Sequence, residues 1–423
     1  MLTGCSGSAL SPDTSTPAGD AVRVGLLIPK SGPYKAIGDD MLKGWNLYLQ
    51  QHGNVLNGRP ITVVEADEGD GKEQARAAAK KLIEQDRVDI IVGGATADTV
   101  QTLDPMLRAA KIPLIGTGGR PSTVTDPTYI WHTSWLSQET GAAIAEHIRT
   151  TVNGPVFVIG PDYIGGHDQI GGFVNAFTSK GGKLANPDGK PTWTPWVPPT
   201  TNFEPFLAKI KQSDAKAVYT FYAGSSAVEF VKQYRQFGIN LPLYGAGFLT
   251  EGAVLTAQGE AARGIWTVMN YAYNLDTNAN RLFVSAFSAA YAGATPNIYH
   301  VTSYDAALVL DMAIREAMHG GGPIPAASPT ASAAPSLGAP TSGASSPAAS
   351  ASPSTPAGPV GPVSSETLLR ALPRIGEVPS PRGPWQFGPV NHTPVQRWYL
   401  RKVDDDGGVL ANVRFAELAT LGS

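Results

Sequence analysis

Short apolar runs alternate with amphipathic patterns along most of the chain, beginning at Val22. The run VRVGLLI over 22–28 precedes a helical pattern at about 40–52, and ITVVEA over 61–66 precedes a second one at 73–85. Runs rich in β-branched side chains indicate buried strands, whereas apolar positions repeated every three to four residues indicate helices. This alternation predicts strand–helix–strand units, in which helices cover both faces of a parallel sheet.

The alternation continues and then starts a second time. In the first series, the apolar runs 88–93 and 112–116 flank a helical pattern at about 99–110. A second series begins after the run 129–135. In that series we expect helices near 138–151, 168–180, 203–212 and 225–237, and strands at 155–160, 216–222 and 241–245. Two α/β domains of similar construction are therefore predicted.

The composition changes abruptly after a third section, which contains helical patterns near 280–291 and 303–319. No Asp, Glu, Lys or Arg lies between Glu316 and Glu366, and most of that segment consists of Ala, Ser, Pro, Gly and Thr. Such a composition buries too little apolar surface to offset the entropy lost on ordering. We therefore expect residues 320–363 to be a disordered surface insertion.

The chain beyond this insertion is too short to fold alone. It contains one helical pattern at 364–372 and strand patterns at 396–403 and 407–415. One helix and a few strands cannot enclose a core of their own. These pieces are expected to complete one or both of the earlier domains.

Length and charge narrow the class of protein. The 423 residues are 42% hydrophobic and 16% charged, which is enough apolar material for two ordinary domains. The formal net charge is −3, and Lys and Arg are scattered rather than gathered into stripes. This pattern argues against nucleic acid as a partner. No apolar run is long enough to span a bilayer.

The single cysteine, Cys5, lies in the run Leu-Thr-Gly-Cys at 2–5, which resembles a bacterial lipobox. In a lipobox the cysteine carries a lipid and becomes the new N-terminus, and the polar segment 6–20 that follows here suits a flexible tether. The charged and hydrophobic parts of a signal peptide do not precede it. The alternative is a free thiol in a disordered tail. A lone cysteine also excludes an intrachain disulfide or a thiolate metal cluster.

No familiar catalytic or metal-binding motif stands out. The chain contains no GxxxxGK[ST], HExxH, GxSxG or CxxC. KIPLIGTGGRPST, over 111–123, comes nearest to a dinucleotide fingerprint, but Pro121 stands where the third glycine belongs and the preceding strand is not the first of its domain. The neighbours His167 and Asp168 are better explained as a helix start than as a catalytic pair. No cofactor, metal or catalytic residue is expected.

The expected carboxyl ends of the strands are rich in small and polar residues, and ligands of open α/β sheets bind at such ends. These loops are 29–40, 93–99, 116–123, 160–168, 222–226 and 245–251. Backbone amides and hydroxyls at such positions capture anions. Aromatic residues are interleaved with them, namely Tyr34, Trp135, Tyr163, Tyr222, Phe248 and Tyr271. Two such edges facing each other would enclose a small molecule.

Several of these stretches resemble the type I periplasmic binding proteins, specifically the branched-chain amino acid-binding group that serves ABC importers. The similarity is carried by VRVGLLIPKSGPYKAIGDDMLKGWNLYLQQ, IIVGGATADTV, IPLIGTGG, IWHTSW, AVYTFYAGSSAVEFVKQYRQFGI and NHTPVQRWYLRKV. It covers roughly 21–320 and 364–415 in order, and the insertion departs from it. The resemblance implies an α/β fold of two Rossmann-like lobes with parallel-rich sheets, joined by three crossovers in the Venus-flytrap manner.

The resemblance also implies how the chain is divided between the lobes. Lobe 1 would hold 21–136 and 269–383, including the insertion, whereas lobe 2 would hold 137–268 and 384–423. Residues 1–20 would be the lipobox and tether. The lobes would close on a ligand by a hinge motion.

By the same resemblance, hydroxyls and amides of lobe 1 hold a ligand carboxylate, and an acidic residue of lobe 2 holds an ammonium group. The matching positions here are Thr96, Ala97 and the turn from Gly118 through Gly119 to Arg120 on one side, and Gly247 and Phe248 on the other. No carboxylate stands where an ammonium group would need one, although Glu251 or Asp162 could replace it. Burying an unpaired ammonium is costly, so a zwitterionic amino acid is disfavoured.

Arg120 stands where the family usually has a small hydroxyl residue. A guanidinium offers a bidentate fork to a carboxylate, and the nearby aromatic residues suit an aromatic or apolar acid. The alternative is that Arg120 points outward and pairs with Asp126 or Glu139. The aromatic residues could likewise belong to the core.

The predicted function is that of an extracytoplasmic, lipid-anchored and monomeric solute-binding protein. It would capture a small organic acid, would deliver it to the transmembrane permease subunits of an ABC importer, and would not be an enzyme. The alternatives are a protein of this family that binds branched-chain or other amino acids, a ligand-sensing receptor domain, and an enzyme with doubly wound domains.

Overall fold

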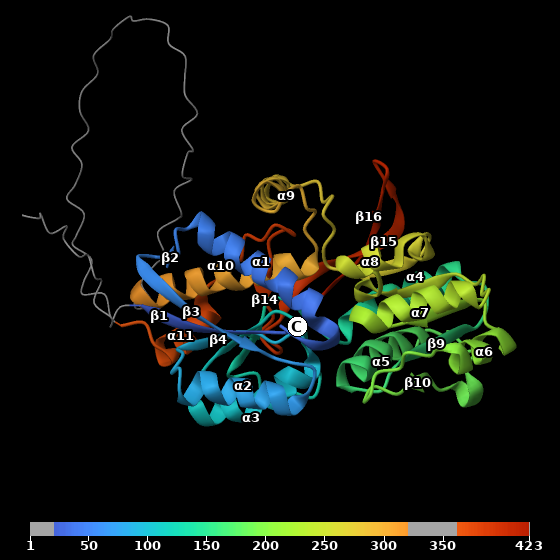
Figure 1. Ribbon diagram of the computed structural model, residues 1–423, viewed down its shortest axis with the longest axis horizontal. Helices are drawn as coiled ribbons and strands as arrows, with labels where there is room; N and C mark the ends of the chain where they lie inside the picture. Colours follow the sequence, from blue (N-terminus) through green and yellow to red (C-terminus); the bar gives the residue numbers. More distant parts are fainter. Residues whose placement is uncertain (1–20, 320–361, 423) are drawn as a thin grey trace, which may run out of the picture.

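The computed structural model describes residues 21–319 and 362–422 (Figure 1). The expected tether 1–20 with Cys5, and nearly all of the expected insertion 320–363, lie outside the described residues. The lipid anchor and the disorder of the insertion therefore stay predictions. The described strands form two large sheets and one short pair.

The first large sheet has six strands in the order β2-β3-β1-β4-β5-β7. They are β1 (Val22–Ile28), β2 (Val55–Leu56), β3 (Arg59–Asp67), β4 (Ile90–Gly93), β5 (Leu114–Gly116) and β7 (Ile130–His132). β1 pairs in parallel with β3 and β4, and the parallel ladder continues through β5 to β7. β2 runs antiparallel to β3, to which it is joined by a tight turn.

Helices cover both faces of this sheet because successive residues of its strands point to opposite sides. Leu26 and Ile28 pack into the core on one side, whereas Leu27 packs into a separate core on the other. Figure 1 shows α1 and α10 above the sheet and α2 and α3 below it. The helices here are α1 (Lys35–Gln51), α2 (Lys72–Glu84), α3 (Ala97–Ala110), α9 (Asn278–Ala290), α10 (Ile298–His319) and α11 (Ser365–Ala371).

The second large sheet has eight strands in the order β10-β9-β11-β12-β13-β15-β14, with β16 paired to β15. They are β9 (Val156–Pro161), β10 (Thr192–Thr194), β11 (Ala217–Thr220), β12 (Leu243–Ala246), β13 (Trp266–Met269), β14 (Gln386–Phe387), β15 (Pro394–Asp406) and β16 (Val409–Leu421). The ladder is parallel from β10 to β13 and antiparallel from β13 onward. The C-terminal strands thus complete the second sheet.

The helices of the second sheet also lie on both faces. Val158 of β9 shares a core with Phe173 and Phe177 of α5. Its neighbour on β9, Phe157, packs into the core on the other face of the sheet. The helices are α4 (Glu139–Thr151), α5 (Ile164–Thr178), α6 (Glu204–Gln212), α7 (Gly224–Gln236) and α8 (Ala253–Gln258). We call the six-stranded sheet with its helices lobe 1 and the eight-stranded sheet with its helices lobe 2.

The chain crosses between the lobes three times: after β7, after β13, and between α11 and β15. The three crossing segments are hydrogen-bonded to one another through Gln396. Its side-chain oxygen accepts from Nδ2 of Asn270 (2.6 Å) and from Nη1 of Arg382 (2.6 Å), and its Nε2 donates to the carbonyl of Ser134 (2.7 Å). We call Ser134, Asn270, Arg382 and Gln396 the crossover network. The residue-level lobe boundaries inferred from the sequence stay a prediction.

A buried carboxylate ties this network to lobe 1. Oδ2 of Asp305, on α10, accepts from Oγ of Ser380 (2.8 Å), Nε of Arg382 (3.1 Å) and Nε1 of Trp385 (3.2 Å). Burial raises the pKa of Asp305 to about 6, although these donors and the Arg382 charge act in the opposite direction. α10 and the third crossover are therefore held as one unit.

Most elements lie where the sequence predicts them, but three helices begin earlier than expected. α1 begins at Lys35 instead of about 40, α5 at Ile164 instead of 168, and α10 at Ile298 instead of 303. In α5 the glycine pair that indicated a loop lies inside the first helical turn. A Cβ on Gly166 would come 2.0 Å from the carbonyl oxygen of Pro161, so the glycine allows this close approach.

A substitution at Gly44 tests the contact between α1 and α10. A Cβ at this position would lie 2.1 Å from the main-chain oxygen of His300, which cannot move aside as a side chain could. We expect Gly44→Ala to lower the free energy of unfolding by about 1–3 kcal/mol, as overpacking does. Urea unfolding followed by circular dichroism measures it.

Gly171, inside α5, is the matched control. No atom lies within 4 Å of the Cβ that would be added there. Gly171→Ala should therefore raise stability by about 0.5–1 kcal/mol, because alanine loses less backbone entropy in a helix. Equal effects of the two substitutions would contradict the described packing of α1 on α10.

Candidate functional site

A cavity lies where the two lobes meet, at the carboxyl ends of strands from both sheets. The empty space between its lining atoms is about 430 Å³, part of it open to solvent, and the centres of water molecules fit in about 50 Å³ of it. The enclosed part of this space is therefore narrow, with the walls of the two lobes close together around it. Its lining residues are Tyr34, Ile37, Ala95, Thr96, Ala97, Gly119, Trp135, Ser137, Tyr163, Gly165, Gln169, Phe221, Ala223, Phe248 and Tyr299.

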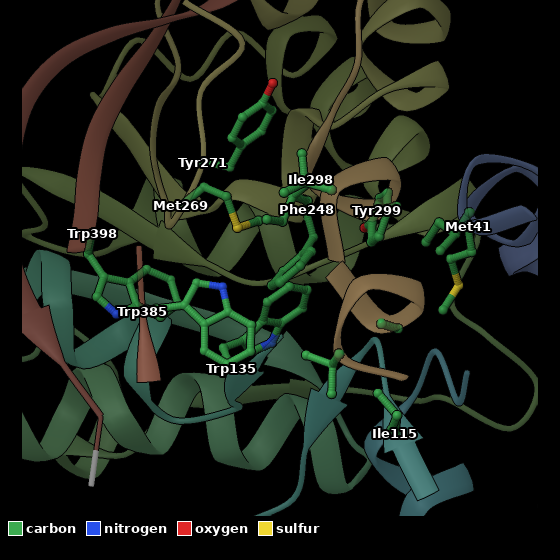
Figure 2. Packing of buried hydrophobic residues seen from close by; sticks show 14 of the residues in the cluster. Met41, Ile115, Trp135, Phe248, Met269, Tyr271, Ile298, Tyr299, Trp385 and Trp398 are labelled. Carbon is green, nitrogen blue, oxygen red and sulfur yellow. The ribbon is translucent and has the colours of Figure 1, made fainter. Parts of the chain in front are cut away.

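Six of the fifteen residues that line the cavity are aromatic, and they come from both lobes. Figure 2 shows Phe248 between Trp135 and Tyr299, with Tyr271 pointing away from them. The ring of Phe248 lies 5.0 Å from that of Trp135 and 6.2 Å from that of Tyr299. Phe248 belongs to the short helix η3 (Gly247–Thr250) of lobe 2, whereas Tyr299 belongs to α10 of lobe 1. The cavity thus exists only where the lobes are close together.

Several helices begin at the cavity. Thr96 caps α3 by accepting a hydrogen bond from the amide of Thr99 (3.1 Å), and Ala97 is the first residue of that helix. Gly165 lies in the first turn of α5, and Ala223 is the N-cap of α7. Helix N-termini carry partial positive charge, so together they favour the negative end of a ligand.

Two buried polar atoms of the lining have no hydrogen-bond partner, namely Nε1 of Trp135 and Oε1 of Gln169. An unpaired buried polar group costs about 1–3 kcal/mol, so such atoms point to a ligand that would satisfy them. The space beside Trp135 is open because Gly119 has no side chain. A Cβ there would lie 2.7 Å from Oγ of Ser137 and 3.3 Å from Nε1 of Trp135.

No charged side chain is among the residues that line the cavity in the described part of the chain. A buried carboxyl lies behind it, that of Glu68, which accepts from the amides of Ala95 (2.8 Å) and Thr96 (3.2 Å) and from Oγ1 of Thr99 (2.6 Å). Burial raises the pKa of Glu68 to about 7 against the opposing effect of these donors. Glu68 therefore supports the start of α3 from behind.

Seven of the predicted site residues line the cavity: Tyr34, Thr96, Ala97, Gly119, Trp135, Tyr163 and Phe248. Their contact with a ligand stays a prediction. Gly118 lies just behind the lining, where a Cβ would come 2.2 Å from the carbonyl oxygen of Ala95. Its role is close packing of two backbone segments.

The structure contradicts the prediction that Arg120 contacts the ligand, because its side chain points away from the cavity. It is 1% exposed, and its Nη2 and Nη1 donate to the carbonyls of Val124 (2.7 Å) and Pro121 (3.3 Å). Burial lowers the pKa of Arg120 to about 10, and the nearby carboxyl of Glu139 acts in the opposite direction. Arg120 forms no ion pair with Asp126, which is bound by Arg108, or with Glu139, which accepts from the amide of Leu136 (3.3 Å).

Arg120 points away from the cavity because side chains alternate between the two sides of a strand. Gly119 and Arg120 form the short strand β6, which pairs in parallel with β8 (Trp135–Leu136). Successive residues of a strand point to opposite sides. Gly119 and Trp135 face the cavity, so Arg120 cannot.

The structure also contradicts the prediction that Tyr222 and Tyr271 line the site, because both side chains belong to the core. The hydroxyl of Tyr222 bonds to Oγ1 of Thr194 (3.0 Å), and its ring packs on Phe230. The hydroxyl of Tyr271 donates to Oδ1 of Asn280 (3.0 Å). Phe221, the residue before Tyr222, lines the cavity in its place.

The two acidic residues considered as replacements for a missing ammonium partner are engaged elsewhere. Glu251 is buried and accepts from Nη2 of Arg401 (2.6 Å) and from the amide of Ile298 (3.2 Å). Asp162 is exposed and lies 2.7 Å from Nε2 of His167. Neither lines the cavity.

Sequence reasoning missed several lining residues, namely Ile37, Ala95, Ser137, Gly165, Gln169, Phe221, Ala223 and Tyr299. Five of these lie in or beside loops that the sequence indicated, so the phase of the strands or nearness to the loops could have found them: Ile37, Ala95, Gly165, Phe221 and Ala223. Tyr299 and Gln169 lie on helices and gave no such signal.

Within residues 21–319 and 362–422, no helix is long and apolar enough to cross a membrane. In the same ranges, no group of three or more His, Cys, Asp or Glu side chains is arranged to hold a metal ion.

Comparison with known proteins finds a match to the family described as "Periplasmic binding protein" over residues 21–408. A Leu/Ile/Val-binding protein homolog from Brucella melitensis is 28% identical over 271 residues, which are 63% of this chain and 68% of that protein.

Two solved structures show the same fold. The solute-binding protein of an ABC transporter from R. palustris, in complex with benzoate, has a TM-score of 0.77 and 27% identity, covering 95% of this chain and 98% of that one. A leucine-binding protein from Thermotoga maritima has a TM-score of 0.75 and 17% identity, covering 94% and 99%, and supports the fold alone. The two-lobed α/β fold expected from the sequence is confirmed.

Arg120→Met tests the corrected position of Arg120. The substitution keeps an unbranched side chain but removes the donor to the carbonyl of Val124 and one of two donors to the carbonyl of Pro121, which keeps the amide of Val124 (3.4 Å). We expect the ligand-free protein to lose about 2 kcal/mol of unfolding free energy, measured by urea unfolding. A residue that points into an open cavity would show almost no loss.

The control is Arg149→Met, which removes a guanidinium from the surface of α4. Arg149 bonds Glu146 on the same helix, and both side chains are partly exposed to solvent. Because exposed ion pairs contribute little, this variant should stay within about 0.5 kcal/mol of the parent.

Proposed function

Because the chain belongs to the periplasmic binding protein family, we propose that it captures a small organic acid with an aromatic or apolar body between its lobes and delivers it to the permease of an ABC importer. The chain is a solute-binding protein of the ABC transporter class, and the members of this class bind rather than convert their ligands. The nature of the ligand is the part that we propose.

The observation that carries the proposal is the lining of the cavity. Six aromatic side chains surround it, namely Tyr34, Trp135, Tyr163, Phe221, Phe248 and Tyr299, and no charged side chain joins them among the described residues. Aromatic walls favour an apolar or aromatic body. An ammonium group would be buried without a carboxylate, which costs several kcal/mol.

The carboxylate of such a ligand would be received by neutral donors. The unpaired Nε1 of Trp135 and the hydroxyl of Ser137 both lie beside Gly119, and Thr96 and Ala97 at the start of α3 line the same cavity. Indole and hydroxyl donors and a helix N-terminus can stabilise an anion without a full positive charge. The benzoate complex of the R. palustris relative supports this class of ligand.

A branched-chain amino acid is the alternative ligand. It is favoured by the name of the Brucella melitensis relative, a homolog of a Leu/Ile/Val-binding protein. In this chain, however, Glu251 is bound to Arg401 and Asp162 is bound to His167. Neither carboxylate is available in the cavity for the ammonium group.

Ligand binding would shift the balance between open and closed arrangements of the lobes. In the closed arrangement described here, the amide and Oγ of Ser122 donate to Asp168 across the cleft (2.9 and 2.5 Å), and Glu251 accepts from the amide of Ile298. A ligand that touches both lobes adds to these contacts and stabilises closure by its difference in affinity for the two states. The closed form would then dock on the permease.

A thermal-shift screen tests the class of ligand. The panel contains benzoate, phenylacetate, cinnamate, leucine and valine. We expect benzoate or phenylacetate to raise the melting temperature, since a ligand at 100 times its dissociation constant adds about 2.7 kcal/mol of stability. Stabilisation by leucine or valine, with none by an aromatic acid, would show that the alternative is right.

Gly119→Ala is the variant that connects the screen to the cavity. Its Cβ would occupy the space beside Oγ of Ser137 and Nε1 of Trp135, where the carboxylate is proposed to lie. Binding of benzoate, measured by calorimetry, should weaken by about tenfold or more, whereas the control Gly171→Ala should bind as the parent does. Unchanged affinity in Gly119→Ala would place the carboxylate elsewhere.

We also propose that a lipid on Cys5 holds the protein on the extracytoplasmic face of the membrane. The proposal rests on the Leu-Thr-Gly-Cys run and the polar segment behind it. Expressed with a signal peptide in a bacterial host, the protein should fractionate with membranes and incorporate labelled palmitate, and Cys5→Ala should do neither. Equal fractionation of the two proteins would exclude the anchor.

A further inference from the structure

The cavity ends at a pair of tyrosines, one from each lobe. Tyr34 closes the short helix η1 (Gly32–Tyr34) of lobe 1, and Tyr163 precedes α5 of lobe 2. Their hydroxyl oxygens are 3.4 Å apart. Tyr34 is buried and Tyr163 is half-buried, so the pair is a wall rather than a surface feature.

A second and larger space lies on the other side of this wall. Its empty volume is about 1160 Å³, part of it open to solvent, against about 430 Å³ for the cavity. Tyr34, Tyr163 and Thr96 border both spaces. Its remaining wall comes from the loop 68–74, the start of α3 and the residues Trp196 and Val197. We call it the outer chamber.

Trp196 braces the tyrosine pair from the outer chamber. Its ring is stacked on that of Tyr163, with centroids 4.6 Å apart and 22° between the planes, and on that of Tyr34 at 5.8 Å and 26°. Trp196 itself borders the outer chamber and not the cavity. The three rings therefore form one stack that spans the two lobes.

The segment that carries Trp196 is held in shape by its own hydrogen bonds. The amide and Oγ1 of Thr200 both donate to the carbonyl of Pro195 (3.1 and 2.9 Å), which closes the turn around Trp196. Immediately before it, Oγ1 of Thr194 is bonded to the hydroxyl of the buried Tyr222. The ring is thus presented to the tyrosines by a braced turn.

We propose that Trp196 sets the length of ligand that the protein accepts, by holding Tyr34 and Tyr163 as a closed partition between the cavity and the outer chamber. Trp196 is a positioning residue, because it acts through the two tyrosines. The inference rests on the proposed function, since it assigns a length limit to the same site. Without Trp196, the ring of Tyr163 is free to turn, and a ligand longer than one ring reaches the outer chamber.

The charges of the outer chamber add a second rule of selection. Asp70, Glu73 and Asp98 border it together with Lys72, which lies 3.3 Å from Asp98. Glu68 also borders it, but burial raises the pKa of Glu68 to about 7, so its charge is partial at neutral pH. A ligand end that reaches this space meets an excess of negative charge. A neutral or ammonium end is accepted there, and a second carboxylate is repelled.

Trp196→Ala tests the length limit by calorimetry with four probes: benzoate, 4-propylbenzoate, 4-(3-aminopropyl)benzoate and 4-(2-carboxyethyl)benzoate. The parent should prefer benzoate to each longer acid by about tenfold or more. In Trp196→Ala we expect this preference to fall to within about threefold for the propyl and aminopropyl acids, and to persist for the carboxyethyl acid. A ratio of affinities separates this effect from general destabilisation, which weakens all four alike.

Trp193→Ala is the matched control. Trp193 comes from the same segment, but its ring packs on His167 at 4.0 Å and borders neither space. The preference of the Trp193→Ala variant for benzoate over the longer acids should equal that of the parent. An unchanged preference in Trp196→Ala, or the same change in Trp193→Ala, would overturn the assignment. Trp196→Leu, which keeps an apolar side chain, serves if the alanine variant does not fold.

If the proposed class of ligand is wrong, the length limit can still be tested separately. If the parent binds no aromatic acid but binds leucine, the same comparison is made with leucine and 2-aminooctanoate. The length limit then predicts that Trp196→Ala narrows the preference for leucine, even though the proposed ligand class is wrong. If none of these probes binds the parent or the variant, both proposals are wrong.

Discussion

The side chain of Gln396 is the point on which the arrangement of the two lobes depends. It bonds at once to Ser134, Asn270 and Arg382, which belong to the three segments that cross between the lobes. All four residues are buried, and a buried amide that loses its partners costs more than it contributes when paired. The three crossings are therefore fixed relative to one another, and Asp305 fixes them to α10.

The charged side chains near the cavity do not take part in lining it. Acidic groups lie close to it on several sides, but each is engaged by its own partners: Glu68 by the amides at the start of α3, Glu251 by Arg401, and Asp168 by Ser122. The polar atoms left for a ligand are neutral, and two of them are buried and unpaired. Such a site distinguishes ligands by shape and by a few directed hydrogen bonds rather than by charge pairing.

The sequence was a good guide to the elements and to the edge at which the site lies, but not to the direction of individual side chains. The alternation of apolar runs with helical patterns located most of the longer helices and strands, because burial imposes those periods directly. The short elements β2, β6, β10 and α8 were not predicted. Arg120 and Tyr222 were placed in the site because they lie in the correct loops. Each is one residue out of phase: Gly119 and Phe221 face the cavity, and their neighbours face the core. Phase within a two-residue strand depends on its partner β8, which only the folded chain reveals. Tyr299 and Trp196 were missed for a related reason, since their roles arise from contacts between lobes.

The alternation within β6 also has a consequence for how such a protein diversifies. Gly119 borders the ligand space, and Arg120, one peptide bond away, holds the loop behind it. Substitutions that alter ligand choice and substitutions that alter folding thus fall on adjacent codons but on opposite sides of one strand. A substitution at Gly119 can therefore reshape the ligand space while the two hydrogen bonds by which Arg120 holds the loop are kept.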